Sequence, residues 1–114
     1  MKVLLSTFFL SVILICSTSA QNKSLSCGTI GTDQTIEKNS TPAKLLSLVA
    51  PKGGTGSFVF QWQSSTDGKT WINIPNAIGD SYAPGFLSVS TIFRRMVTNG
   101  NSSCTTNMVK VTIK

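Results

Sequence analysis

The sequence contains no histidine, and only four of its 114 residues are acidic. Without histidine, the common Ser–His and Cys–His nucleophile pairs cannot form. The acids are Asp33, Glu37, Asp67 and Asp80, and no two have a spacing that indicates paired catalytic carboxylates. Metal-ligand clusters are absent, and the glycines of 53–56 precede a predicted strand rather than the helix of a phosphate-binding loop. The sequence therefore predicts no catalytic residue, no metal and no cofactor, and a protein that is not an enzyme.

Long apolar runs are absent except at the amino terminus. Met1-Lys2 is followed by a nearly apolar stretch at 3–15 and by small residues up to Ala20. This order is typical of a secretory signal peptide cleaved after Ala20, and the run is too short for a transmembrane helix. The alternative is a lipoprotein acylated at Cys16, but Ile15 is not the small residue expected before such a cysteine.

The domain boundaries follow from this signal. We expect a signal peptide at 1–20, a short N-terminal segment at 21–26 and a single domain at 27–114, since 94 mature residues leave no room for a second core. The mature chain would be secreted, periplasmic or associated with the cell surface.

Few cysteines remain once the signal is removed. Cys27 and Cys104 are the two, and an oxidising compartment favours a disulfide between them. A catalytic thiol is the alternative, and the lack of histidine disfavours it.

Basic residues outnumber acids by nine to four in the mature chain, a net charge of +5, but they are scattered. A nucleic-acid interface needs clustered positive charge, so we expect no nucleic-acid partner.

Helical periodicity is absent from the mature chain, and short alternating runs recur about every 8–12 residues. The expected strands cover 29–36, 44–50, 57–63, 69–74, 81–83, 91–99 and 107–114, with a turn at 99–103. About seven short strands indicate an all-β sandwich or barrel.

The predicted core is aromatic. Phe58, Phe60 and Trp62 alternate on one face of the clearest strand, and a buried tryptophan is common on the third strand of a sandwich. Leu87 and Phe93 have the spacing with which a sandwich chain turns into its sixth strand.

Polar side chains occupy the opposite strand face. Gln61 and Gln63 are expected beside Arg94, either as a solvated ladder or as a site for an acidic partner or a glycan. Arg95 would point inward and extend to an edge. Trp71 is interpreted either as the edge of the core or as an exposed ligand platform.

Two motifs carry a resemblance to a known family. Phe60-Gln-Trp-Gln-Ser-Ser-Thr-Asp-Gly68 with Trp71, followed by Thr91-Ile-Phe-Arg-Arg95, resembles the bacterial immunoglobulin-like repeat of Bacteroidetes surface proteins. The resemblance covers nearly all of the mature chain. It implies an immunoglobulin-like or fibronectin-III-like β-sandwich, export, and a spacer or adhesive role at the cell surface.

The sequence departs from the family pattern in ways that limit the comparison. Glu37 stands where family members often have a cysteine, so Cys27 would take its place as the partner of Cys104. There is one copy here rather than a tandem array, and no sorting domain follows Lys114.

The function expected from these features is a non-enzymatic exported module for binding, adhesion or assembly. Its contact surfaces would be the Gln61/Gln63/Arg94 face, the 51–56 loop and edge strands, through which copies could self-associate. The alternatives are a glycan-binding module, for which an exposed Trp71 would be a sign, and a small hydrolase inhibitor acting through the 75–80 loop.

Overall fold

The chain forms two sheets. A computed structural model describes residues 24–114, so the predicted signal peptide, Cys16 and the cleavage site after Ala20 lie outside the described residues. Within that range the strands are β1 (Thr29–Gly31), β2 (Gln34–Ile36), β3 (Leu46–Val49), β4 (Val59–Ser65), β5 (Ile72–Asn73), β6 (Thr91–Asn99), β7 (Ser102–Thr105) and β8 (Val109–Ile113). No helix in this part of the chain could cross a membrane.

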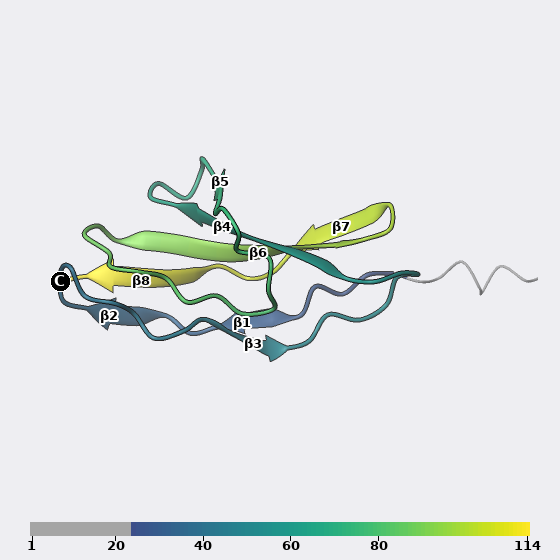
Figure 1. Ribbon diagram of the computed structural model, residues 1–114, viewed down its shortest axis with the longest axis horizontal. Helices are drawn as coiled ribbons and strands as arrows, with labels where there is room; N and C mark the ends of the chain where they lie inside the picture. Colours follow the sequence, from purple (N-terminus) through teal and green to yellow (C-terminus); the bar gives the residue numbers. More distant parts are fainter. Residues whose placement is uncertain (1–23) are drawn as a thin grey trace, which may run out of the picture.

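The larger sheet has the order β2-β8-β6-β4-β5, and β7 also pairs with β6. The smaller sheet contains β1 and β3, which run below the layer of β4, β6 and β8 in Figure 1. The predicted all-β fold is therefore confirmed, with eight strands where about seven were expected.

Strand β6 is the centre of the larger sheet. Its range, Thr91–Asn99, is the predicted one, and its side chains alternate between buried and half-buried along the whole strand. It pairs antiparallel with β4 from Val59↔Thr98 to Ser65↔Ile92. This register places β4 two residues later than predicted, because the pairing with β6 rather than the local alternation sets where β4 begins.

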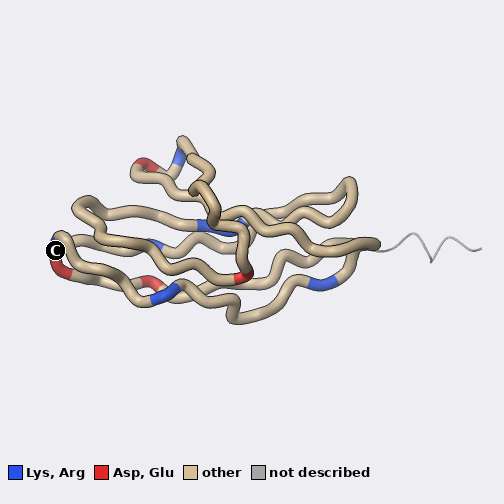
Figure 2. The backbone as a smooth tube through the Cα atoms, viewed as in Figure 1, with Lys and Arg blue, Asp and Glu red and all other residues tan. Residues whose placement is uncertain are grey.

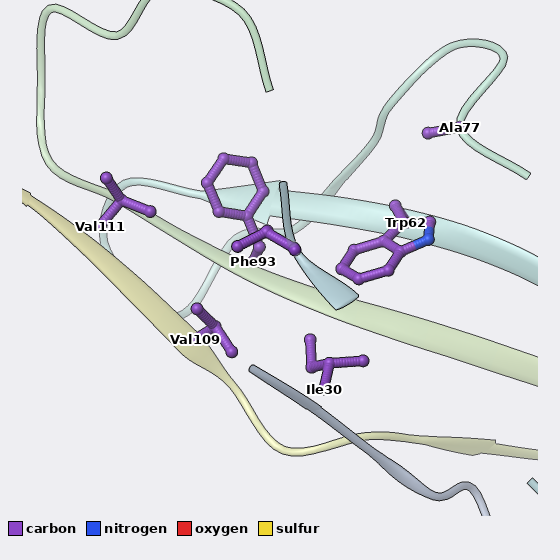
Figure 3. Close-up of a cluster of buried hydrophobic side chains, with 7 residues drawn as sticks. Ile30, Trp62, Ala77, Phe93, Val109 and Val111 are labelled. Carbon is purple, nitrogen blue, oxygen red and sulfur yellow. The ribbon is translucent and has the colours of Figure 1, made fainter. Parts of the chain in front are cut away.

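The core lies between the sheets and takes side chains from both. Figure 3 shows Ile30 from β1 facing Trp62, Phe93 and Val109 from the larger sheet. Of the predicted core residues, Trp62 and Phe93 are buried, with 0% and 2% of their surface exposed. Phe58, Phe60 and Leu87 are only half-buried.

The predicted first strand is divided between the two sheets. β1 pairs with β3, whereas β2 pairs in parallel with β8. Where the chain passes from β1 in the smaller sheet to β2 in the larger sheet, two side chains bond this segment to β8 or to the residues just before it. The Asn107 amide accepts from the Ile30 N–H at 2.8 Å and donates to its carbonyl at 2.9 Å, and Asp33 accepts from the Lys110 N–H. Ile30 lies opposite Ser47 of β3, and the amide of Asn107 takes the place of a second strand by bonding to the Ile30 backbone.

The strand predicted at 69–74, after the Asp67-Gly68 turn, is much shorter in the structure, where β5 covers only Ile72–Asn73. The carboxylate of Asp67 accepts hydrogen bonds from the Lys69 and Thr70 N–H groups, each at 2.8 Å, and from the Ser65 hydroxyl at 3.0 Å. These bonds hold the chain in a turn until β5 begins, and they lower the pKa of Asp67 from 3.8 to about 2. Gly68 has a φ of +76°, the left-handed conformation expected for this glycine.

Two further predictions about strands are wrong. Residues 81–83 form only an isolated bridge between Tyr82 and Leu45. Residues 102–103 are not part of a turn, because β7 begins at Ser102 and pairs with Asn99 across the two-residue turn at 100–101. The strand was missed because Ser102–Thr105 has no apolar residue that alternates with polar ones.

The disulfide between Cys27 and Cys104 is confirmed. It joins the segment before β1 to β7, with a Cα–Cα distance of 5.9 Å and a sequence separation of 77.

Candidate functional site

A row of hydrogen-bonded polar side chains crosses the outer face of the larger sheet. Arg94 Nε donates to Gln63 Oε1 at 2.7 Å, and Gln63 Nε2 donates to Asn73 Oδ1 at 2.8 Å. The strand register brings these residues together, since Gln63 lies opposite Arg94 on β6 and opposite Asn73 on β5. We call Arg94, Gln63 and Asn73 the polar row.

Trp71 lies at the end of the polar row. The guanidinium carbon of Arg94 is 4.1 Å from the centre of the Trp71 ring, the distance of a cation–π contact. Trp71 is half-buried and is not among the residues that pack against the core cluster. One face of the Trp71 ring is therefore covered by the guanidinium of Arg94.

Gln61 is not part of the polar row. Its Nε2 donates to the carbonyls of Trp62 and Ile74, at 2.8 and 2.9 Å, so the amide joins β4 to the chain that leaves β5. The structure thus brings together Gln63, Arg94 and Trp71 of the predicted surface and separates Gln61 from them. Asn73 was missed, although its alternation with Trp71 was a usable signal.

Arg95 is buried completely, and the expectation that it reaches an edge is wrong. Its NH1 and NH2 groups donate to the carbonyls of Asp80 at 2.7 Å and Cys27 at 3.1 Å, and its guanidinium lies over the Phe60 ring. Its Nε has no hydrogen-bond partner among the described residues. Burial lowers the pKa of Arg95, and the charge of Asp80 opposes this effect. Arg95 therefore connects the backbone at Cys27, before β1, to the end of the 75–80 loop through hydrogen bonds.

The two loops predicted as contact surfaces are both held in place. Asn99, 2% exposed, accepts from the Thr55 and Gly56 N–H groups and donates to the Gly56 carbonyl. A Cβ at Gly54 would overlap this amide, so a glycine is required there. The 75–80 loop is fixed by Trp62, whose indole N–H donates to the Gly79 carbonyl at 2.8 Å.

A cleft of about 380 Å³ opens on the inner side of the β4–β5 edge. We call it the β5 cleft. Its large apolar side chains come from three parts of the chain. Ile72 and Ile74 lie in β5 and just after it, Phe93 lies in β6, and the segment 82–87 contributes Tyr82, Phe86 and Leu87. Ile72 and Phe86 are exposed at 63% and 79%, while Tyr82 packs against Phe93 with ring centres 5.9 Å apart. Burial raises the pKa of Tyr82.

The β5 cleft is open because small residues follow Trp62 on the inward face of β4. Ser64 and Thr66 continue the alternation with hydroxyl side chains where an apolar residue would fill the space. Thr91 and Tyr82 bring the number of hydroxyl-bearing side chains to four, and no charged side chain lines the cleft. Its size and composition are those of a binding site for an uncharged group. Sequence reasoning missed it because its walls lie far apart in the chain.

The family model described as Domain of unknown function (DUF8696) matches residues 26–114. The chain belongs to this family. A search of the curated proteins finds no match. The DUF8696 match includes all eight strands, the polar row and the β5 cleft, so both surfaces belong to the family domain.

The acidic residues of the DUF8696 domain are spread over its surface, as Figure 2 shows. Glu37 forms an ion pair with Lys114 at 3.1 Å, and Asp33 and Asp67 accept from backbone N–H groups. Within residues 24–114 no three potential metal ligands lie together.

Proposed function

We propose that this chain is an exported, non-enzymatic binding module of the bacterial cell surface, built as an immunoglobulin-like β-sandwich. The observation that carries the proposal is the β5 cleft, an open apolar site without charged groups beside a sheet edge. Exposed Phe86 and Ile72 at such a site favour contact with another molecule, since large apolar side chains gathered at a hollow mark interaction sites.

The strand order supports the immunoglobulin-like type. In that fold the last strand, the sixth and the third lie side by side, and variable-type domains add a further strand next to the third. The order β8-β6-β4-β5 corresponds to this arrangement, and buried Trp62 lies on the strand in the position of the third. The disulfide departs from the usual pattern because it joins Cys27 and Cys104 outside the two central strands.

Export and surface location rest on three observations. The amino-terminal residues have the composition of a secretory signal. The disulfide is typical of proteins in oxidising compartments. The resemblance to Bacteroidetes surface repeats supports a place at the cell surface.

A glycan is the less favoured ligand. Arg94 lies over one face of the Trp71 ring, which reduces the ring surface on which a sugar could stack. The β5 cleft offers mainly apolar walls with four hydroxyl-bearing side chains, which suit an uncharged apolar group better than a sugar.

The test of the proposed function is a titration of the exported protein with N-acetyl-phenylalaninamide, followed by NMR. Amide shifts are expected at Ser64, Ile72 and Thr91. Phe86→Ser should weaken binding several-fold, whereas Val89→Ser should not, because Val89 is also exposed but does not line the cleft. Methyl glycosides serve as the competing probe. Shifts with glycosides alone, or no effect of Phe86→Ser, would refute the proposed site.

Strand β3 favours self-association as a second function. Leu46, Leu48 and Val49 are 49%, 57% and 52% exposed, and in the described chain no strand pairs with the other edge of β3. An apolar edge strand of this kind readily pairs with a second copy. Light scattering should show a dimer that Leu48→Lys disrupts and that Val59→Lys, at an equally exposed position on β4, leaves intact. A monomer at all concentrations would exclude this mode.

A further inference from the structure

Strand β5 forms one edge of the larger sheet, and among residues 24–114 no strand pairs with its outer side. It is the last strand in the order β2-β8-β6-β4-β5. The Ile74 N–H donates to the Trp62 carbonyl at 3.0 Å, so the backbone of Ile74 faces β4. Backbone groups of neighbouring residues in a strand point in opposite directions. The N–H and C=O of Asn73 therefore face away from the sheet, and Asn73 is exposed.

The β5 cleft and the polar row lie on the two sides of this edge. Ile72 and Ile74 line the cleft on the inner side. Asn73 also borders the cleft, but its side-chain amide bonds to Gln63 in the polar row, and Trp71 lies with that row on the outer side. A peptide paired with β5 would therefore place alternate side chains in the cleft and beside the polar row. Added strands are recognised in this way, by main-chain hydrogen bonds together with pockets for alternate side chains.

The charges of the two sides differ and indicate the chemistry of such a peptide. The cleft is lined only by uncharged side chains. On the outer side, Arg94 reaches across β4 and ends over Trp71, and no carboxylate among residues 24–114 forms an ion pair with it. An apolar residue fits the inner side, and an acidic residue fits the outer side.

We infer that the edge of β5 binds an extended peptide as an additional strand, with bulky apolar side chains entering the β5 cleft and alternating acidic side chains facing Arg94. The inference rests on the proposed binding function and names the class of partner. The short length of β5 limits the contact to a few residues, so the cleft supplies the specificity.

The first experiment uses the exported protein and an array of peptides of the form Ser-Glu-X-Glu-X-Glu-Ser, where X is Leu, Ile, Val, Phe, Tyr or Trp. The best binder is then remade with a single N-methyl group at each position. In an added strand, one of the two alternating sets of N–H groups faces β5. N-methylation of that set should weaken binding about tenfold or more, and N-methylation of the other set should change it little. The Asn73 amide resonance should shift on binding.

A second experiment tests whether Arg94 recognises the acidic side chains of the peptide. Arg94→Gln should reduce affinity for the Glu peptide several-fold and leave affinity for the matching Gln peptide almost unchanged. Lys110→Gln removes an exposed cation on β8, outside both the cleft and the polar row, and should have little effect on either peptide.

The outcomes separate this inference from the proposed function. Equal sensitivity to N-methylation at every position would overturn strand addition. If N-acetyl-phenylalaninamide enters the cleft but no array peptide binds, strand addition is wrong and the cleft remains a binding site. If neither probe binds, both the inference and the proposed function are wrong.

Discussion

Removal of the disulfide should destabilise the domain mainly through the unfolded chain. The perturbation is the double substitution Cys27→Ser and Cys104→Ser. The bond closes a loop with a sequence separation of 77, for which the chain-entropy relation gives about 4–5 kcal/mol. Domains of this size have total stabilities of about 5–15 kcal/mol, so the loss is a large part of the whole.

The folded state should change little in this variant. Arg95 donates to the backbone carbonyl of Cys27, and this bond does not require the sulfur atoms. Ile30 remains bonded to Asn107 close by. The unfolded chain, in contrast, becomes free to expand and exposes more surface, so the denaturant m-value should rise.

The assay is urea unfolding of the purified protein, followed by circular dichroism, with reduced wild type as the matched control. We expect the reduced wild type and the double variant to have the same free energy of unfolding, about 4–5 kcal/mol below the oxidised protein. At about 4–8 °C per kcal/mol, the melting temperature should fall by roughly 16–40 °C. A loss below about 1 kcal/mol with an unchanged m-value would refute the entropic account.

Three other substitutions test single features of the fold. Because the folded-state pKa of Asp67, about 2, lies below its ordinary value of 3.8, the carboxylate stabilises the fold above about pH 4 and loses this effect as the pH falls through about 2. The stability difference between wild type and Asp67→Asn should shrink over that window in urea unfolding, and a constant difference would contradict it. Trp62→Phe removes an indole hydrogen bond and buried volume and should cost about 1–3 kcal/mol by the same assay; a neutral result would contradict the packing described. Asn107→Leu leaves the Ile30 backbone without partners and should cost about 1–3 kcal/mol, whereas Asn101→Leu in the exposed hairpin turn should stay within about 0.5 kcal/mol. Equal effects of the two would refute the role of Asn107.

Local alternation predicts the central strands well. The range of β6 is correct because nine consecutive residues alternate and each has a partner in the same sheet. The alternation also puts Trp62 and Phe93 on the buried face. Where local alternation competes with side-chain hydrogen bonds, the prediction fails: the carboxylate of Asp67 shortens β5, and the side chains of Asp33 and Asn107 hold the first segment where it passes between sheets.

The candidate site could be predicted only in part. Gln63 and Arg94 follow from strand alternation and neighbouring strands, and the structure joins them through a hydrogen bond. The hydrogen-bond partners of Gln61 and Arg95 could not be predicted from the sequence. Gln61 bonds to backbone carbonyls of its own hairpin, and Arg95 finds carbonyl partners at Asp80 and Cys27. Neither partner is marked by residue type, since every residue has a carbonyl.

Residue order is sufficient for the all-β class, for the pairing of Cys27 with Cys104 and for the buried face of β6. Each depends on local alternation or on the presence of only two cysteines after the predicted signal peptide. The β5 cleft, the contact of Arg94 with Trp71 and the crossing of the chain between sheets arise only in the folded molecule. Each depends on segments distant in the sequence, and their distances are set by strand register and by the volume of the side chains packed between them.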